Sequence, residues 1–131
     1  MEKTKMNKIL KVIVAAPAIL FLFIGVRWLA APAGVAAEFG MPLLDGLGRS
    51  TQIGDFAAFF IGIGTMMLLG VATQRNTWFL APAILLSLTA VFRVVAWLAH
   101  DASFAVEQIA VEVVVSALLF FAASRTATGQ A

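Results

Sequence analysis

Long runs of apolar residues, broken by short polar stretches, set the pattern of this chain. Four runs reach the length of a membrane-crossing helix, namely residues 9–31, 53–71, 78–99 and 105–123. Roughly 20 apolar residues in a helix cross the ~30 Å hydrocarbon core of a bilayer. The pattern therefore predicts an all-α fold, an integral membrane four-helix bundle, with residues 1–131 forming a single transmembrane domain.

The longest connection between two runs, residues 32–52, has a mixed character. Its glycines and prolines disfavour a continuous helix, and they stand at positions 32, 34, 40, 42, 46 and 48. The segment is also apolar, with Phe39 and Leu47 among its residues, so a freely solvated loop is not expected. We expect an interfacial loop between helices 1 and 2 with one short helical turn. This loop either covers a functional site or only seals the bundle.

The amino-acid composition supports insertion into a membrane. Of the 131 residues, 62% are hydrophobic and 12% are charged, whereas a typical soluble domain has about 25% charged residues. The chain has no cysteine, which excludes disulfides and thiolate metal sites. A net charge of only +2 gives no basis for a nucleic-acid partner. Membrane lipids are the expected surroundings.

Basic residues near the first run indicate how the bundle is oriented. Lysine and arginine concentrate on the cytoplasmic side of membrane proteins, and lysines stand at positions 3, 5, 8 and 11. If the four runs alternate in direction, Arg75 and Arg125 fall on the same side as these lysines. We therefore predict a multi-pass protein with both termini in the cytoplasm.

The N-terminal stretch MEKTKMNKILKVIVAAPAIL also has the pattern of a signal peptide, with a basic start followed by an apolar run. The apolar run from Ile9 to Val26 has 18 residues, however, and the apolar region of a signal peptide has about 7–15. We therefore expect a retained helix.

Two opposite charges lie inside the third and fourth runs. Arg93 is six residues from Ala99, the expected outer end of the third helix, and Glu112 is seven residues from Ala105, the start of the fourth. At 1.5 Å per residue both lie about 10 Å deep, on helices that a short turn makes antiparallel neighbours. A charge inside a membrane is costly and is usually paired or functional. We predict an Arg93–Glu112 ion pair.

Other polar side chains accompany this pair in the outer half of the bundle. Spacings of three or four residues place Trp97 and His100 on the helix face of Arg93, and Gln108 on that of Glu112. Arg27 and Asp55 add one charge each from the first and second runs. We expect a polar pocket open to the outer face, with the candidate ligand-binding residues Arg93, Glu112, Gln108, Asp55, Arg27, Trp97 and His100. In the alternative interpretation, the ion pair only locks two helices, and Arg27 and Asp55 are ordinary interfacial charges.

Small residues recur every four positions in the second run, at Gly54, Ala58 and Gly62. They would share one helix face, and faces of this kind permit close contact between helices in membranes. We expect this face to pack against another helix.

The absence of known catalytic and cofactor-binding motifs reduces the number of functions that the sequence supports. It has no P-loop, dinucleotide fingerprint, nucleophile elbow or zinc-protease motif. His100 is the only histidine, so one chain cannot supply two histidines to a haem, and the dispersed acids lack metal-ligand spacing. The sequence favours a non-catalytic protein with no predicted metal or cofactor. A lipid or a quinone would suit a pocket of this character.

Three stretches resemble the DoxX-like superfamily of small four-helix bacterial membrane proteins, in particular its branches of unknown function. GDFAAFFIGIGTMMLLG is similar to the glycine-rich second helix, VFRVVAWLAHD to the third helix with its arginine, and QIAVEVVVSALLFF to the fourth helix with an embedded glutamate. The resemblance implies a four-helix fold in the bacterial inner (plasma) membrane, with Arg93 and Glu112 as corresponding positions. The namesake member is associated with a quinone-linked thiosulfate oxidation complex, which implies a quinone ligand or a role in such a complex.

Two classes of function fit these observations. In the first, the protein binds a lipid, quinone or other hydrophobic ligand in an outer-leaflet polar pocket, or acts as accessory subunit of a larger membrane complex. In the second, it is a small transporter or channel that works as a homo-oligomer. A transporter places its site near the bilayer midplane with access from both sides. The uniformly apolar inner half argues against such a path through a single copy.

Overall fold

Five helices account for most of the described chain. The computed structural model describes residues 6–126, and within them the helices are α1 (Lys8–Ala30), α2 (Pro32–Glu38), α3 (Gly46–Thr73), α4 (Thr77–Ala99) and α5 (Val106–Ser124). All except α2 are long and apolar enough to cross a membrane. The predicted all-α architecture with four spans is confirmed, and the chain is a multi-pass membrane protein. Lys3 and Lys5, which helped to predict the orientation, lie outside the described residues.

Three of the four predicted spans match the observed helices to within one residue at each end, but the second does not. Helix α3 begins at Gly46 rather than at residue 53, with Gly46 at a φ of +54° that glycine adopts readily. The short turn expected in residues 32–52 is the seven-residue helix α2. It starts at Pro32, because the first residue of a helix needs no N–H for an intrahelical bond.

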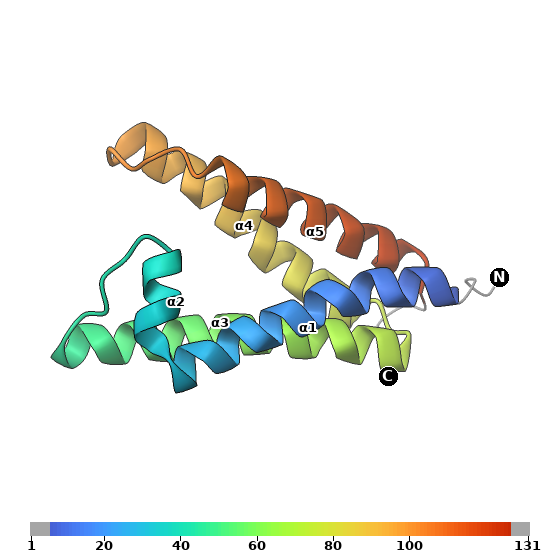
Figure 1. Cartoon of the computed structure of the whole chain (residues 1–131). Helices are drawn as coiled ribbons and strands as arrows, with labels where there is room; N and C mark the ends of the chain where they lie inside the picture. The colour runs from blue at the N-terminus through green and yellow to red at the C-terminus, as the bar shows by residue number, and fades with distance from the viewer. Residues whose placement is uncertain (1–5, 127–131) are drawn as a thin grey trace.

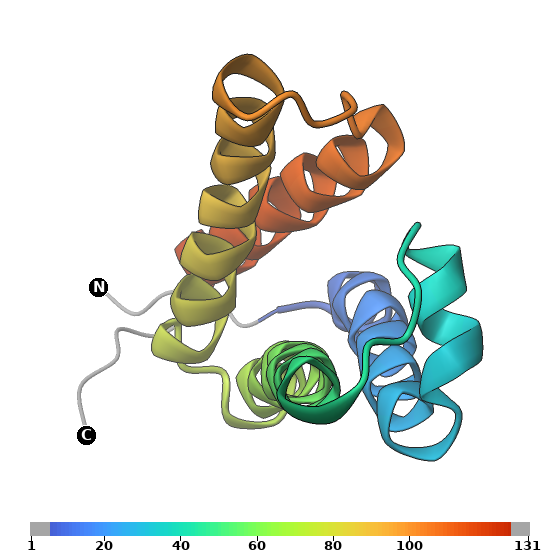
Figure 2. The ribbon, with the colours of Figure 1, turned by 90° about the vertical axis from the view of Figure 1, so that its left-hand side faces the viewer.

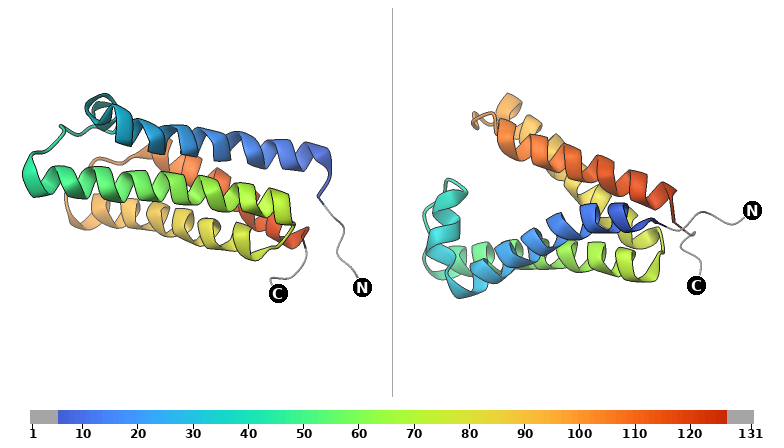
Figure 3. Two further views of the ribbon diagram at one scale, coloured as in Figure 1. Left: turned by 90° about the horizontal axis from the view of Figure 1, so that it is seen from below. Right: turned by 45° about the vertical axis from the view of Figure 1, so that its right-hand side comes forward.

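The four long helices form two pairs arranged as a V. Helix α1 packs along α3, and α4 packs along α5, while contacts between the two pairs are fewer. Figures 1 and 3 show that the pairs meet at one end and splay apart at the other. The narrow end holds the start of α1, the end of α5 and the α3–α4 turn, and the wide end holds α2 and the α4–α5 turn. Figure 2, which looks in from the wide end, shows the space between the pairs.

Side chains from every long helix fill the narrow end. Among the largest fully buried ones are Val14, Met67, Phe79 and Leu119. Gly70 of α3 makes room for the ring of Phe79, since an added Cβ there would lie 2.5 Å from the ring atom Cε1. The backbone N–H of Met6 donates to Oε1 of Gln74 at 3.1 Å. This bond ties the start of α1 to the end of α3, while the packing of Phe79 against Gly70 holds the two pairs together.

Glycines bring α1 and α3 close together. A Cβ added at Gly64 would lie 2.7 Å from the carbonyl oxygen of Ala18, and one added at Gly25 would lie 2.9 Å from the backbone nitrogen of Ile61. Real Cβ atoms essentially never come within 3.0 Å of another heavy atom. Because these neighbours are backbone atoms, only glycine permits this spacing of the helices.

The small-residue face predicted at Gly54, Ala58 and Gly62 is not the contact face of α3. An added Cβ at Gly54 or Gly62 would have no neighbour within 4 Å, and Ala58 is exposed. The prediction was wrong for a single chain because the inward face of α3 runs through other residues at spacings of three and four, which are Ala57, Phe60, Gly64 and Met67.

Aromatic rings fill the α1–α3 pair towards the wide end. Trp28 is fully buried, and its indole stacks on the ring of Phe56 with centroids 4.7 Å apart. Phe39, just after α2, meets both rings edge-on. The indole Nε1 of Trp28 has no hydrogen-bond partner among residues 6–126. This buried cluster fixes α2 and the residues after it against the membrane-crossing helices.

Two sets of polar contacts order the chain between α1 and α3. Arg27 donates from Nη1 to Oε2 of Glu38 at 2.8 Å and from Nη2 to Oε1 at 2.7 Å. This hydrogen bonding lowers the pKa of Glu38 from its ordinary value, against a smaller opposing effect of desolvation. The buried amide of Gln52 accepts from the N–H of Leu44 at 2.7 Å and donates to the carbonyl of Pro42 at 3.0 Å. The residues that the sequence presents as an interfacial loop are therefore fastened at two points.

Candidate functional site

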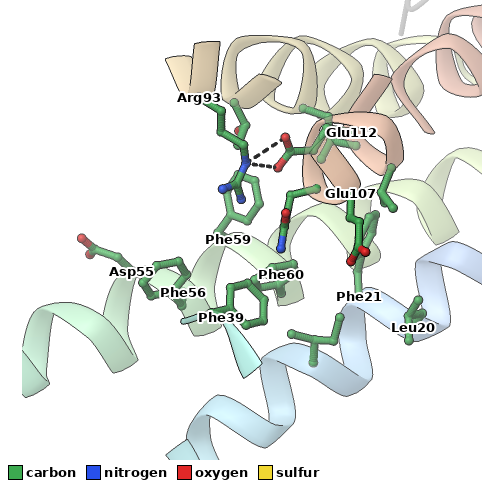
Figure 4. A pocket seen from close by; sticks show the side chains of 15 residues that line it. Leu20, Phe21, Phe39, Asp55, Phe56, Phe59, Phe60, Arg93, Glu107 and Glu112 are labelled. Atoms are coloured by element: carbon green, nitrogen blue, oxygen red, sulfur yellow. Dashed lines mark hydrogen bonds and ion pairs between the residues drawn. The ribbon is translucent and has the colours of Figure 1, made fainter. Parts of the chain in front are cut away.

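A cavity occupies the space between the two helix pairs, towards the wide end (Figure 4). Its volume is about 540 Å³, and all four long helices contribute to its lining. Ligand pockets in proteins have volumes of about 300–1,000 Å³ and are mostly apolar with a few polar groups. Of residues 32–52, only Phe39 lines this cavity. The interfacial segment therefore forms part of one wall and does not cover the cavity as expected.

One wall of the cavity is aromatic and belongs to the α1–α3 side. Phenylalanine rings from α1, from the residue after α2 and from α3 form it, and these are Phe21, Phe39, Phe56, Phe59 and Phe60. The Phe60 ring contacts Phe21 at 5.9 Å, Phe39 at 5.6 Å and Phe59 at 5.3 Å between centroids. Sequence reasoning missed this wall. The signal for it was the spacing of Phe56, Phe59 and Phe60, which places three rings near one another on one side of a helix.

The opposite wall carries the ion pair that the sequence predicts. Nε of Arg93 on α4 donates to Oε1 and Oε2 of Glu112 on α5, at 3.0 and 2.9 Å. The side chain of Glu112 is 10% exposed and that of Arg93 is 33% exposed. The Arg93–Glu112 pair is confirmed, and the matching depths of the two residues on antiparallel helices explain how it forms. Figure 4 shows the pair facing the phenylalanine rings across the cavity.

The head of Arg93 keeps hydrogen-bonding capacity to spare. Both bonds to Glu112 come from Nε, and neither Nη1 nor Nη2 donates to another residue within 6–126. A guanidinium has five N–H donors in a rigid planar fork, so four donors of Arg93 have no acceptor among these residues. Gln108 of α5 lines the same cavity and adds an amide group. The Thr89 hydroxyl donates instead to the carbonyl of Leu85, at 2.8 Å.

Two further carboxylates line the cavity, one from each helix pair. Asp55 belongs to α3 and Glu107 to the first turn of α5. Neither forms an ion pair or hydrogen bond with another of the described residues. Asp55 is among the candidate residues predicted from the sequence, and Glu107 is not. The common signal was position, because both are acidic residues near the wide-end terminus of a span.

The structure brings four of the seven candidate residues to the cavity and leaves three outside it. Arg93, Glu112, Gln108 and Asp55 line it. Arg27 points to Glu38 instead, His100 is exposed after the end of α4, and Trp97 contacts Phe104 with ring centroids 4.8 Å apart. Trp97 and His100 lie four and seven residues beyond Arg93, which takes them past the cavity towards the α4–α5 turn. No cluster of three metal-ligating side chains occurs within residues 6–126.

Comparison with known proteins gives no relative from which to assign a role. No family model matches the chain, and neither a curated protein nor a solved structure does. The cavity and the chemistry of its walls are therefore the basis for assigning a function.

Proposed function

We propose that this chain binds a hydrophobic molecule with a polar head, such as a lipid or a quinone, in the cavity between its helix pairs. The observation that carries the proposal is the pairing of the two walls. Five phenylalanine rings face an ion pair whose guanidinium retains free donors, across a cavity of about 540 Å³. An amphipathic ligand would place its head at Arg93 and Glu112 and its apolar body against the rings.

The proposed location is the bacterial inner membrane, with the wide end outside and both chain termini in the cytoplasm. Basic side chains support this orientation, since the narrow end carries Lys8, Lys11, Arg75 and Arg125. Such residues concentrate on the cytoplasmic side of membranes. In this orientation the cavity opens in the outer leaflet, where a ligand can reach it from the surrounding lipid. The resemblance to the DoxX-like superfamily agrees with this placement and stays a prediction.

A transporter or channel function has less support in a single copy. Transporters give their site access from both faces of the membrane. Here the narrow end is filled by buried apolar side chains from all four long helices, among them Met67, Phe79 and Leu119. This packing closes the cavity towards the cytoplasmic side of the proposed orientation. The site is better suited to holding a ligand than to passing one across.

A pair of tryptophan variants tests the proposal. Val111 lines the cavity and Val113 does not, yet both are 51% exposed on the same helix. Val111→Trp should fill the cavity without removing any polar group, whereas Val113→Trp should only add a ring facing lipid. The protein is purified in a mild detergent, and native mass spectra are recorded for wild type and both variants. Organic extraction then identifies any retained molecule.

We expect a reproducible small-molecule adduct on wild type and on Val113→Trp, and its loss from Val111→Trp. A wild-type chain without any adduct, or an adduct that survives Val111→Trp, would contradict ligand binding in this cavity. A retained second protein in place of a small molecule would favour the role of accessory subunit in a membrane complex.

A further inference from the structure

The formal charges that line the cavity do not balance. The lining includes three carboxylates, those of Asp55, Glu107 and Glu112, and one guanidinium, that of Arg93, so its formal net charge is −2. An arginine in an apolar cavity would by itself suggest an anionic ligand, because guanidinium groups pair readily with carboxylates and phosphates. The excess of carboxylates argues against that simple interpretation.

Within the protein, the carboxylate of Glu112 already neutralises the charge of Arg93. Both carboxylate oxygens of Glu112 accept hydrogen bonds from its Nε, at 3.0 and 2.9 Å. What Arg93 still offers is a set of N–H donors on Nη1 and Nη2, without the net positive charge that would attract an anion. These donors can serve the oxygen of an uncharged group as well as that of a charged one.

Asp55 and Glu107 add two carboxylates without a protein partner to the lining of the same cavity. They come from opposite helix pairs, and neither forms an ion pair among residues 6–126. Figure 4 shows the Glu107 carboxylate extending from α5 towards the rings of the other pair, below Glu112. An anionic head group bonded to Arg93 would therefore lie beside Glu112, in a cavity whose lining includes two further carboxylates. Repulsion between like charges gives specificity by weakening the binding of anionic heads, without adding to the binding of uncharged ones.

We propose that the cavity selects molecules whose head is uncharged and accepts hydrogen bonds, such as an ester, amide or ketone, and that Asp55 and Glu107 determine this specificity by repelling anionic heads. The inference rests on the proposed function and narrows its ligand class. Arg93 binds the head-group oxygen through Nη1 and Nη2, Glu112 cancels the charge of Arg93, and the phenylalanine rings hold the apolar body.

Three probes with the same hydrocarbon chain and different heads test this specificity. They are palmitamide (uncharged), palmitate (anionic) and hexadecylamine (cationic). The purified chain is placed in nanodiscs of phosphatidylcholine, and each probe competes against tritiated palmitamide at mildly alkaline pH. We expect palmitate to compete at least about tenfold more weakly than palmitamide, because the lining of the cavity carries a net negative charge that repels an anionic head.

Removal of the two carboxylates should change the ratio of the affinities for palmitate and palmitamide. In the double variant Asp55→Asn with Glu107→Gln, we expect palmitate to come within about threefold of palmitamide. The matched control is Asp101→Asn, which removes an acid from the same end of the molecule but outside the cavity. Asp101 has a φ of +57°, a conformation that asparagine tolerates, and its variant should keep the wild-type ratio.

The failure of this inference is distinct from the failure of the proposed function. Equal competition by palmitate and palmitamide in wild type overturns the inference and leaves ligand binding standing. The inference is also overturned if hexadecylamine is the best competitor and its binding is weaker in the double variant. The carboxylates would then attract a cationic head. The absence of saturable binding for all three probes, with no difference between wild type and Val111→Trp, overturns both proposals.

Discussion

In the α1–α3 pair, two glycines let the helix backbones touch, whereas in the α4–α5 pair an ion pair joins the helices across the membrane-buried surface. A Cβ at Gly64 would meet the backbone of Ala18 at 2.7 Å, and no rearrangement of a side chain relieves that contact. Arg93 and Glu112 meet through side-chain atoms at 2.9 Å, and part of the Arg93 head is still accessible. The first pair is fixed by backbone shape and the second by polar chemistry that a ligand can share.

This difference assigns the two pairs different roles around the cavity. The α1–α3 pair presents a rigid aromatic wall, supported from behind by the buried Trp28. The α4–α5 pair presents the only guanidinium that lines the cavity. Changes at the glycine contacts of the first pair should therefore affect folding, while changes to the ion pair of the second should affect both stability and binding. The four predictions that follow test this separation.

The largest effect is expected where α1 and α3 touch. Gly64→Leu adds a side chain whose first carbon already collides with the backbone of Ala18, so we expect a loss of more than about 3 kcal/mol of stability and no folded protein in detergent. Gly62→Leu is the matched control, because a Cβ there has no neighbour within 4 Å. Size-exclusion chromatography of both variants checks this. Equal recovery of folded protein would show that α1 and α3 do not need their close spacing.

The next effect is expected at the ion pair, and it should be unequal for its two members. Arg93→Gln strands the carboxylate of Glu112, whose side chain is 10% exposed, and should cost about 2–3 kcal/mol. Glu112→Gln strands Arg93, which is 33% exposed and can turn its long side chain towards the membrane surface, so we expect only about 1 kcal/mol. Thermal unfolding in detergent measures both.

The charge-exchanged variant, Arg93→Glu with Glu112→Arg, provides the corresponding control. If the two residues stabilise each other directly, it should recover most of the stability lost in Arg93→Gln. A double variant no more stable than Arg93→Gln would show that these residues act through other neighbours.

A smaller effect is expected at Gln52. Gln52→Leu removes the amide that bonds to the N–H of Leu44 and the carbonyl of Pro42, and it should cost about 1–2 kcal/mol. Hydrogen exchange should report the loss as faster exchange in residues 40–46. Ser50→Ala, at an exposed position on the same helix, should leave that exchange unchanged. Faster exchange in both variants would mean that the helix start, and not the Gln52 amide, orders the segment.

The smallest effect is a dependence on pH at the Arg27–Glu38 contact. Because the hydrogen bond from Arg27 lowers the pKa of Glu38, this pair stabilises the fold above the ordinary glutamate pKa of about 4.3. The contribution is lost as the pH falls below that value, through the lowered pKa of the folded state. Protection of the α2 amides, measured by hydrogen exchange, should fall in this window in wild type and stay constant in Glu38→Gln. The same fall in Glu38→Gln would assign it to another group.

The sequence was sufficient for the spans and for the ion pair. Apolar runs of membrane-spanning length admit few other folds, and Arg93 and Glu112 stand at matching distances from a short turn. The prediction of the spans and that of the ion pair both depend on distances along a helix, and these can be counted in the sequence. The expected ligand-binding role of these residues stays a prediction.

The splay of the helix pairs and the aromatic wall could not be predicted in the same way. The spacing of Phe56, Phe59 and Phe60 indicates that their rings lie near one another. It does not indicate whether they face lipid or a cavity, because a phenylalanine in either place can have the same neighbours in sequence. The small residues of α3 misled for the same reason, since Gly62 and Gly64 differ only in which face of the helix they occupy. The contact between Arg27 and Glu38 forms because α2 folds back towards α1. The glycines and prolines of residues 32–52 gave no indication of this fold.

The buried indole of Trp28 also provides an intrinsic fluorescence probe of the cavity. The chain has three tryptophans, and replacing Trp78 and Trp97 with phenylalanine would make Trp28 the only source of tryptophan fluorescence. An indole in dry surroundings without a hydrogen-bond acceptor emits at short wavelength. Its stacking partner, Phe56, lies on the cavity wall, so a molecule that displaces that ring would change the emission intensity. Occupation of the cavity could then be followed in real time without a label.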